Sequence, residues 1–217
     1  MENFWVIDLI LLENLKGISL SVIISIIIFK YGIEFFQKFI PGFFGTCISN
    51  QKTSLYHKPI LRGLGIMFPL ACIPFLYQII NNFAAHDILL VLLSTLIGFW
   101  DDKKNLRQKK KLAIICLLGL TYLFVDAFLF SDDSIDNFFY ILNFFLFVFL
   151  LLFFNQVDGI NGLATSTFIV LLVILNVFIG NILLIIPFLV ITIYYLTFNI
   201  RGKIGIQGEA GSFFLGA

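Results

Sequence analysis

Charged residues are scarce in this sequence. Only 12% of its 217 residues are Asp, Glu, Lys or Arg, whereas soluble globular domains carry roughly 25%. Hydrophobic residues make up 60% of the chain, and the mean hydropathy is +1.02. A water-soluble fold of this length has too little interior to cover so much apolar surface. The sequence therefore predicts an integral membrane protein.

Cysteine is also rare, and its spacing argues against metal or redox chemistry. Cys47, Cys72 and Cys116 form no C-x-x-C pair, so we interpret them as small core or lipid-facing side chains. The sequence also lacks a long linker rich in Pro, Gly or Ser and shows no internal repeat. We therefore expect residues 1–217 to form a single transmembrane domain. The first 30 residues lack the basic start and the small-residue cleavage site of a signal peptide.

Long apolar runs recur along the chain at about the length that a membrane helix needs, roughly 17–20 residues. We predict an all-α bundle of about seven spans, with the start of an eighth at Phe213. Three charged residues, Asp8, Glu13 and Lys16, interrupt the beginning of the first run. Residues 1–14 are therefore expected to form an amphipathic segment at the membrane surface. The seven runs cover residues 17–29, 64–80, 86–100, 112–130, 138–155, 163–179 and 182–198.

The basic residues divide the connecting loops into two classes. Every Lys and Arg except Lys16 lies in a loop of one class, whereas the alternate loops carry aspartates and no basic residue. Basic loops stay in the cytoplasm. We therefore predict a multi-pass protein of the inner (plasma) membrane with its N-terminus outside. The loops predicted to be cytoplasmic are 30–62, 101–111, 155–162 and 199–212.

Polar residues collect at the predicted cytoplasmic ends of three spans. Asp101 and Asp102 are adjacent at the end of the third span. Since like charges repel, a divalent cation or a positive neighbour would stabilise the pair. The alternative is an ordinary solvated helix end, with Lys103 and Lys104 as topology anchors.

The second polar group follows the Phe- and Leu-rich run that ends at Phe154. Asn155 and Asp158 are three residues apart, so one helical turn places them on the same side. No Lys or Arg lies in the loop at 155–162, and a carboxylate this close to hydrocarbon is costly and is a functional candidate by default. The alternative is a hydrated turn between two spans.

The third group, residues 208–212, opens the last apolar run. Small residues at a helix start leave backbone N–H groups free to bind a phosphate, and Glu209 offers oxygen ligands to Mg²⁺. The alternative is a helix cap made by Ser212. Because all three groups share one predicted membrane face, their four carboxylates and the lysine-rich loop beside them predict a site for a metal ion and a polyphosphate.

In this order, the residues resemble the motifs of the polyprenyl-phosphate N-acetylhexosamine-1-phosphate transferases (glycosyltransferase family 4). The pair Asp101-Asp102 is similar to the D-D motif of that family. Residues 155–162 (NQVDGING) are similar to N-x-x-D-G-x-[DN]-G, and residues 208–212 (GEAGS) to G-D-x-G-S. Residues 54–65 resemble the S-x-H-x-x-P-x-x-R-G-G-G loop of the sugar-antigen branch, with one extra residue before the histidine. The translocases that make lipid I differ in this loop.

The resemblance implies an Mg²⁺-dependent phosphotransferase, in which Mn²⁺ can replace Mg²⁺. It implies transfer of N-acetylhexosamine 1-phosphate from a UDP-sugar to a polyprenyl (undecaprenyl) phosphate. This reaction releases UMP and is the first membrane step of cell-envelope polysaccharide synthesis. The expected partners are these two substrates, the lipid bilayer and a second copy in a homodimer, with no nucleic acid. The implied roles are catalytic for Asp101, Asp102 and Asp158, substrate-binding for Asn155, Lys111, Arg62 and Ser212, and metal-binding for Glu209 and Asp158.

The sequence departs from the family pattern at several points. The usual F-M-G-D reads Ile206-Gln207-Gly208-Glu209, so a longer carboxylate replaces Asp and the aromatic residue is lost. A ligand misplaced by about 1 Å can cost roughly 100-fold in rate. Leu64 stands for a glycine of the R-G-G-G motif. Members of the family continue with further spans, so we expect a chain that is incomplete at its C-terminus and inactive as this segment alone.

Two other functions fit some of these features. One is a catalytically inactive relative that acts as a membrane scaffold, which the replacement at Glu209 favours. The other is a transporter that uses membrane-embedded carboxylates. Only Asp126 and Pro187 lie within spans as that function requires.

Overall fold

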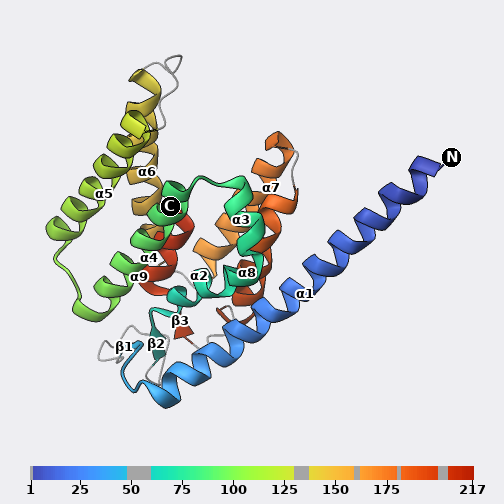
Figure 1. Cartoon of the computed structure of the whole chain (residues 1–217). Coiled ribbons are helices and arrows are strands. Elements are labelled where there is room, and N and C mark those ends of the chain that lie inside the picture. Colours follow the sequence, from blue (N-terminus) through green and yellow to red (C-terminus); the bar gives the residue numbers. More distant parts are fainter. Residues whose placement is uncertain (1, 48–59, 130–136, 159–161, 180–181, 200–204) are drawn as a thin grey trace.

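The computed structural model describes residues 2–47, 60–129, 137–158, 162–179, 182–199 and 205–217. The fold is helical, with a small sheet at one end (Figure 1). The helices are α1 (Glu2–Phe39), η1 (Leu64–Ile66), α2 (Met67–Cys72), η2 (Ile73–Phe75), α3 (Leu76–Asn82), α4 (Ala85–Lys104), α5 (Gln108–Leu129), α6 (Asn137–Val157), α7 (Leu163–Ile179), α8 (Ile182–Asn199) and α9 (Gly208–Gly216). The strands are β1 (Gly45–Cys47), β2 (Ile60–Arg62) and β3 (Gly205–Ile206).

Two helical stretches in the described part of the chain are long and apolar enough to cross a membrane. They are Gly17–Phe39 and Phe138–Val157, and shorter apolar helices cover Leu64–Phe75, Leu163–Phe178 and Ile185–Thr197. The predicted helical fold class is confirmed, apart from the small sheet. The number of seven spans stays a prediction.

Two predicted segments differ in the structure. The run at 64–80 is a succession of short helices rather than one continuous α-helix, since it contains Pro69 and Pro74, and proline removes a helix donor and crowds the preceding turn. Residues 2–14 are no separate segment, because α1 continues without a break to Phe39. The N-terminal part of α1 projects away from the other helices (Figure 1).

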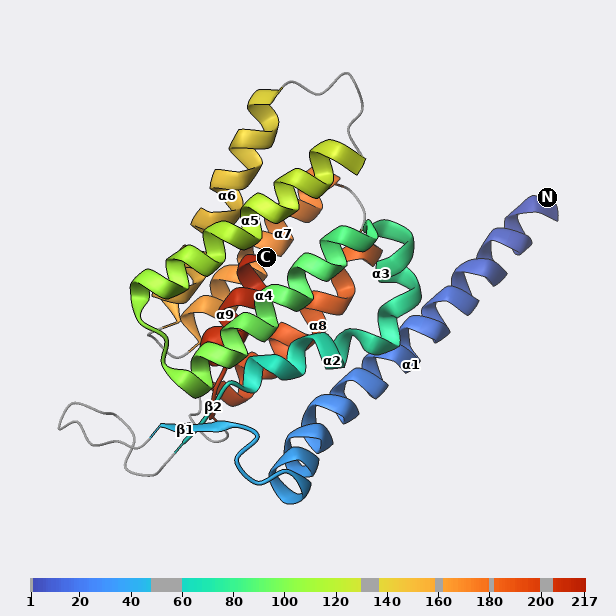
Figure 2. The same ribbon diagram turned by 60° about the vertical axis from the view of Figure 1, so that its left-hand side comes forward.

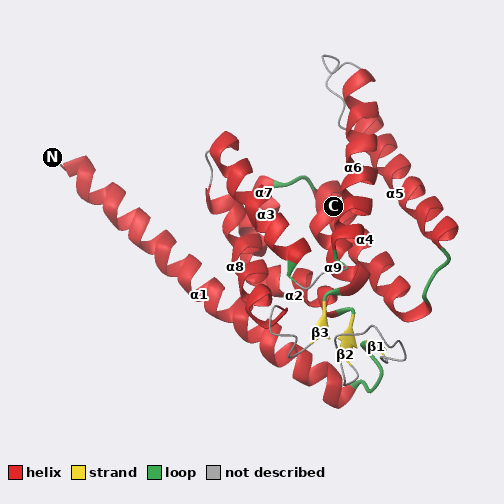
Figure 3. Ribbon diagram, turned by 180° about the vertical axis from the view of Figure 1, so that it is seen from behind, coloured by secondary structure: helices red, strands yellow, loops and turns green. Residues whose placement is uncertain are grey.

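The small sheet joins two distant parts of the chain. β2 pairs antiparallel with β1 and parallel with β3, which sets Arg62 beside Ile206. The sheet lies at the end of the bundle where α4 stops and α5 and α9 start (Figures 1 and 3). It therefore anchors the segment that carries Arg62 next to the N-terminus of α9.

Helix α9 lies inside the bundle, packed mainly between α4 and α6 (Figure 2). Two glycines allow its backbone to come this close. A methyl group on Gly98 of α4 would lie 2.3 Å from the Glu209 carbonyl oxygen, and one on Gly65 would lie 2.0 Å from the Gly211 nitrogen. Close packing on both sides fixes the position of α9, and with it that of Glu209.

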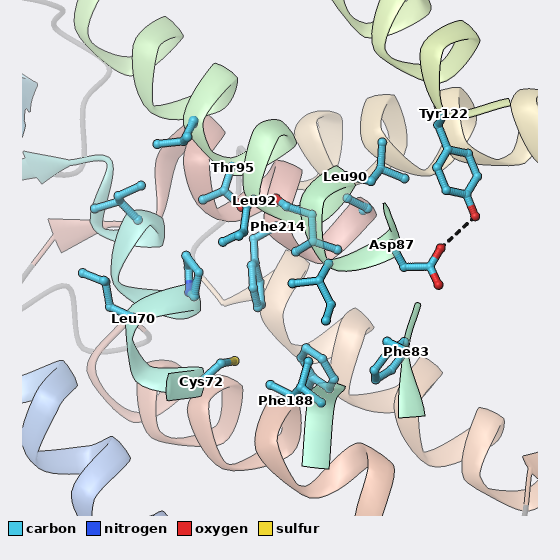
Figure 4. Close-up of a pocket in the computed structure, with 18 of the residues that line it drawn as sticks. Leu70, Cys72, Phe83, Asp87, Leu90, Leu92, Thr95, Tyr122, Phe188 and Phe214 are labelled. Carbon is cyan, nitrogen blue, oxygen red and sulfur yellow. Dashed lines mark hydrogen bonds between the residues drawn. The ribbon is translucent and has the colours of Figure 1, made fainter. Parts of the chain in front are cut away.

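A separate apolar cavity of about 960 Å³ lies between α2, α4, α8 and α9 (Figure 4). Its lining includes Phe188, Phe214, Asp87 and Tyr122. The Tyr122 hydroxyl donates a hydrogen bond to Asp87 Oδ1 at 2.9 Å. Asp87 is in the first turn of α4, whereas Asp102 is near its last residue. With a rise of about 1.5 Å per residue, roughly 20 Å of helix separates them. The Asp87–Tyr122 pair is therefore distinct from the polar motifs.

Candidate functional site: a polar cluster at one end of the bundle

The polar motifs of the sequence meet at the end of the bundle that carries the sheet. Helices that are far apart in the sequence each contribute one or two side chains through their ends. The cluster consists of Arg62 from β2, Asp101 and Asp102 from α4, Lys111 from α5, Asn155 from the end of α6, Asp158 from the turn that follows α6, and Glu209 from α9.

Asp102 caps α9 from another helix. The backbone N–H groups of Glu209 and Ala210 donate to its Oδ1 and Oδ2 at 2.9 and 3.0 Å. Its side chain is 0% exposed, and burial raises the pKa of Asp102 to about 6 against the opposing effect of these two hydrogen bonds. Gly208 makes the contact possible, since its φ is +68° and a Cβ there would lie 2.5 Å from the Asp102 carboxylate. Asp102 therefore stabilises the helix start that presents Glu209.

Asp101 shapes the turn between α4 and α5. Its Oδ1 accepts a hydrogen bond from the Leu106 N–H at 2.6 Å, and its backbone carbonyl accepts one from Asn105 at 2.8 Å. Its Oδ2 lies 2.9 Å from Lys111 Nζ. The carboxylate thus connects the turn to Lys111, which also contacts Glu209 of α9.

Lys111 bridges two carboxylates from different helices. Its Nζ is 2.9 Å from Asp101 and 2.7 Å from Glu209 Oε2, and its side chain is 11% exposed. The Asn155 amide completes this group, with its oxygen accepting from Lys111 Nζ at 3.0 Å and its nitrogen donating to both Glu209 oxygens, at 3.0 Å for Oε1. This amide orientation is assigned from its neighbours, because the reverse would point oxygen at a carboxylate. Burial raises the pKa of Glu209, and Lys111 opposes that rise.

Arg62 makes a second bridge on the other side of Glu209. Its Nε lies 2.8 Å from Asp102 Oδ1, and one terminal nitrogen lies 3.7 Å from Glu209 Oε1. The other terminal nitrogen donates to Asn105 Oδ1 at 3.0 Å. Its side chain is 25% exposed, so the guanidinium is the more accessible of the two cations.

Asp158 differs from the other carboxylates because no described cation lies within ion-pair distance of it. Burial raises the pKa of Asp158 to about 8, and the charges of Glu209 and Asp102 add to that rise. The Gln207 side chain and the charge of Arg62 act in the opposite direction on this pKa. A cation near Asp158 would therefore relieve an unfavourable charge.

The donor types and the charge of the cluster fit a divalent cation. Four carboxylates face two cations, which leaves a formal charge of −2 when all six groups are ionised. Mg²⁺ prefers such oxygen ligands. In the described part of the chain, however, no three acidic, histidine or cysteine side chains are close enough to hold an ion. Lys111 lies between Asp101 and Glu209, and Arg62 lies between Asp102 and Glu209. These two cations account for the distances between the carboxylates.

The structure does not bring the Ser212 hydroxyl into these contacts. It donates to the Glu209 carbonyl at 3.1 Å, and the residue is buried inside α9. Ser212 is not the helix cap either, since α9 already begins at Gly208. Residues 54–59 of the predicted loop motif lie outside the described residues. The catalytic, substrate-binding and metal-binding roles of the other predicted residues stay predictions.

Three residues of the site were missed by the sequence analysis. Asn105 accepts the Arg62 hydrogen bond from a left-handed conformation with φ of +48°. Gln207 and Thr165 are buried and joined by a hydrogen bond of 3.1 Å. The one available signal was the amide of Gln207 at a position where the motif has an apolar residue.

Comparison with known proteins gives one family. Its description is Glycosyl transferase family 4, and its profile matches residues 85–217, more than half of the chain. No curated protein matches the sequence. The matched region contains the whole cluster except Arg62.

Proposed function

Because the chain belongs to glycosyl transferase family 4, we propose that it transfers a sugar 1-phosphate from a UDP-sugar to a polyprenyl phosphate. Family membership supports a transferase that acts on sugar phosphates and a polyprenyl phosphate. The finer proposal is that the sugar is an N-acetylhexosamine, that the lipid is undecaprenyl phosphate and that the reaction starts a cell-envelope polysaccharide.

The observation that carries this proposal is the pair of cation bridges around Glu209. Lys111 and Arg62 each contact Glu209 and one residue of the aspartate pair. Both cations can bind a phosphate. The Lys ammonium does so as a compact point charge, and the planar Arg guanidinium does so by donating two parallel hydrogen bonds. We expect the two cations to exchange carboxylate partners for phosphate oxygens when the nucleotide-sugar binds.

The bond changes follow from the two substrates. An oxygen of the polyprenyl phosphate attacks the phosphorus that bears the sugar, and a new P–O bond forms. The bond from that phosphorus to the oxygen of UMP breaks, and UMP leaves with the electron pair. A proton on the attacking oxygen passes to a carboxylate of the cluster, for which Asp101 is the candidate.

Glu209 and Asp158 are the residues that would hold Mg²⁺. When bound, the ion neutralises charge that spreads over the phosphate oxygens. The chain itself contributes the orientation of the reacting groups, since Asp102 and the glycines on α4 and η1 fix α9. Fixed donors of this kind stabilise developing charge without reorganising during the reaction.

The placement of the cluster agrees with this pair of substrates. One substrate is a lipid of the bilayer and the other is a soluble nucleotide, so their site belongs at a membrane surface. We propose that the end of the bundle with the sheet faces the cytoplasm of the inner (plasma) membrane and that the N-terminus is outside. A homodimer stays a prediction.

The proposal is tested by measuring UMP release from the full-length protein in membranes. The assay contains Mg²⁺, undecaprenyl phosphate and one of several UDP-sugars, and UDP-N-acetylhexosamines are expected to give the highest rate. Activity that appears only after Glu209→Asp would support an inactive relative. If neither the natural chain nor Glu209→Asp releases UMP from any UDP-sugar, the proposed reaction is wrong.

A further inference from the structure

The turn between α4 and α5 presents a group of cations to the outside of the protein. The turn lies at the outer edge of the bundle (Figures 1 and 2). Asp101 and Asp102, in the same stretch of sequence, are buried. The charged side chains that are exposed on this turn are therefore all positive. They belong to Lys103, Lys104, Arg107, Lys109 and Lys110.

The carboxylates next to this turn are engaged by other groups. Asp101 accepts a hydrogen bond from the Leu106 N–H and lies 2.9 Å from Lys111. Asp102 binds the start of α9 and lies 2.8 Å from Arg62. Within the described ranges, none of the five exposed cations forms an ion pair with a carboxylate. The described part of the chain therefore leaves the positive charge of the turn without a counterion.

The turn nevertheless holds a defined shape. The Asn105 N–H donates to the Asp101 carbonyl at 2.8 Å, which closes the end of α4. The Lys103 ammonium lies over the rings of Phe43 and Phe99, 5.2 and 5.0 Å from their centroids. A cation over an aromatic face is attracted by the ring quadrupole. The exposed cations are therefore carried by a backbone that is fixed at both ends.

Two effects make this concentration of positive charge unfavourable for the chain alone. Like charges that lie close together repel each other. In addition, Lys109 and Lys110 lie in the first turn of α5, which carries no acidic residue, and the positive end of the helix dipole repels cations there. A negatively charged partner outside the chain would offset both effects. The group of cations therefore indicates an anionic partner.

The apolar surface beside the turn favours a lipid as that partner. On α4, Leu96 and Trp100 are 53% and 50% exposed and precede the basic residues. On α5, Leu112 and Leu117 are 45% and 63% exposed and follow them. Tryptophan is enriched where hydrocarbon meets the headgroups of a membrane, and Lys and Arg near a membrane surface attract anionic lipids. A soluble polyanion would bind the cations but would leave this apolar surface in water.

We propose that the α4–α5 turn binds the headgroups of anionic phospholipids. Lys104, Arg107 and Lys109 contact the lipid phosphates, and Trp100 and Leu112 contact the upper part of the acyl chains. Lys111, the next cation along α5, contacts Asp101 and Glu209 of the polar cluster instead. The lipid-binding surface is thus separate from the polar cluster, and the inference does not depend on the proposed reaction.

The test follows the fluorescence of Trp100 in vesicles. Trp5→Phe leaves Trp100 as the only tryptophan of residues 1–217. The protein is reconstituted into phosphatidylcholine that contains either brominated phosphatidylglycerol or brominated phosphatidylcholine, since bromine quenches a nearby tryptophan. We expect phosphatidylglycerol to bind beside Trp100 about fivefold more tightly than phosphatidylcholine. This preference should disappear in about 1 M NaCl, where the Debye length is roughly 3 Å.

A triple variant with Lys104→Gln, Arg107→Gln and Lys109→Gln is expected to lose the preference for phosphatidylglycerol. The matched control combines Lys30→Gln and Lys38→Gln, two exposed lysines of α1, and should keep it.

Equal binding of the two lipids beside Trp100 in the protein with Trp5→Phe alone overturns the inference, as does a triple variant that keeps the preference. If the triple variant does not fold, a preference that is unchanged in about 1 M NaCl overturns it. Loss of the preference on addition of micromolar inorganic tripolyphosphate would indicate a site for a soluble polyphosphate and would overturn the lipid as the partner.

Discussion

At the scale of single residues, the cluster is held together by cations that each serve two anions. Lys111 and Arg62 both contact Glu209, and each also contacts one residue of the aspartate pair. A shorter Asp in place of Glu209 would have to move its backbone to keep both contacts. The longer side chain at this position therefore fits the spacing of the two cations in this protein.

Replacing Glu209 by Gln is expected to lower UMP release by about 100-fold or more. The change removes the charge that binds Lys111 and the proposed metal ion while leaving the shape almost unchanged. Steady-state rates of the variant and of Glu34→Gln, an exposed glutamate of α1, provide the comparison. Equal rates for the two variants would show that Glu209 has no part in the reaction.

Lys111→Met is expected to damage both stability and activity. It leaves Asp101 and Glu209 without their shared cation, and breaking such a buried pair costs on the order of 3 kcal/mol. Lys110, one residue earlier and exposed, gives the control Lys110→Met. Lys111→Met should have a lower Tm and a lower rate of UMP release than Lys110→Met. Equal Tm values and equal rates for the two variants would exclude the bridging role of Lys111.

The stability of the protein should depend on the Asp158 charge. Its pKa is raised from 3.8 to about 8 in the folded protein, so the folded state favours the protonated acid. The stability from this group is complete below about pH 4 and is lost as the pH rises through about 8. In metal-free buffer, Asp158→Asn should therefore gain Tm over the natural protein as the pH is raised. A Tm difference that stays constant between about pH 5 and about pH 9 would contradict this prediction.

At the scale of elements, the position of α9 depends on glycine at the helix contacts. Gly98→Ala is expected to push α9 away from α4, since the new methyl group would lie 2.3 Å from the Glu209 carbonyl. Such overpacking costs about 1–3 kcal/mol, and a shift of Glu209 by about 1 Å would lower activity roughly 100-fold. Gly17→Ala in α1 meets nothing within 4 Å and should match the natural protein in Tm and UMP release.

The elements themselves were largely predictable, because long apolar runs have only the helical solution in a membrane. The predicted run at 86–100 corresponds to α4, and the run at 138–155 to α6. The strands were not predictable, since segments of two or three residues show no alternation of polar and apolar side chains. Helix α9 begins five residues before the apolar run at Phe213, because Asp102, from another helix, caps its start.

At the scale of the whole molecule, the basic residues Arg62 and Lys111 lie in the polar cluster at one end of the bundle. Cysteine labelling tests which side of the membrane this end faces, in a chain whose natural cysteines are replaced by serine. Lys109→Cys at the start of α5 should react with an impermeant maleimide only in inverted vesicles. Ala85→Cys at the start of α4 should react only in intact cells. The opposite pattern would reverse the predicted orientation.

The candidate site could be assembled from the sequence in part. Topology alone placed Asp101, Asn155 and Glu209 on one face, and the structure brings all three to Lys111. How the carboxylates share their cations could not be predicted, because that depends on side-chain distances between four helices and a strand. The Gln207–Thr165 contact spans 42 positions and has no local pattern.

The cap on α9 also sets an order of events during synthesis. Asp102 accepts hydrogen bonds from residues 107 and 108 positions later in the chain. At a synthesis rate of about 5–20 residues per second, these partners are made on the order of ten seconds after Asp102. Arg62, which precedes it, is already made and is the countercharge present during that interval. Helix α9, which is made after the other described helices, thus completes the cluster.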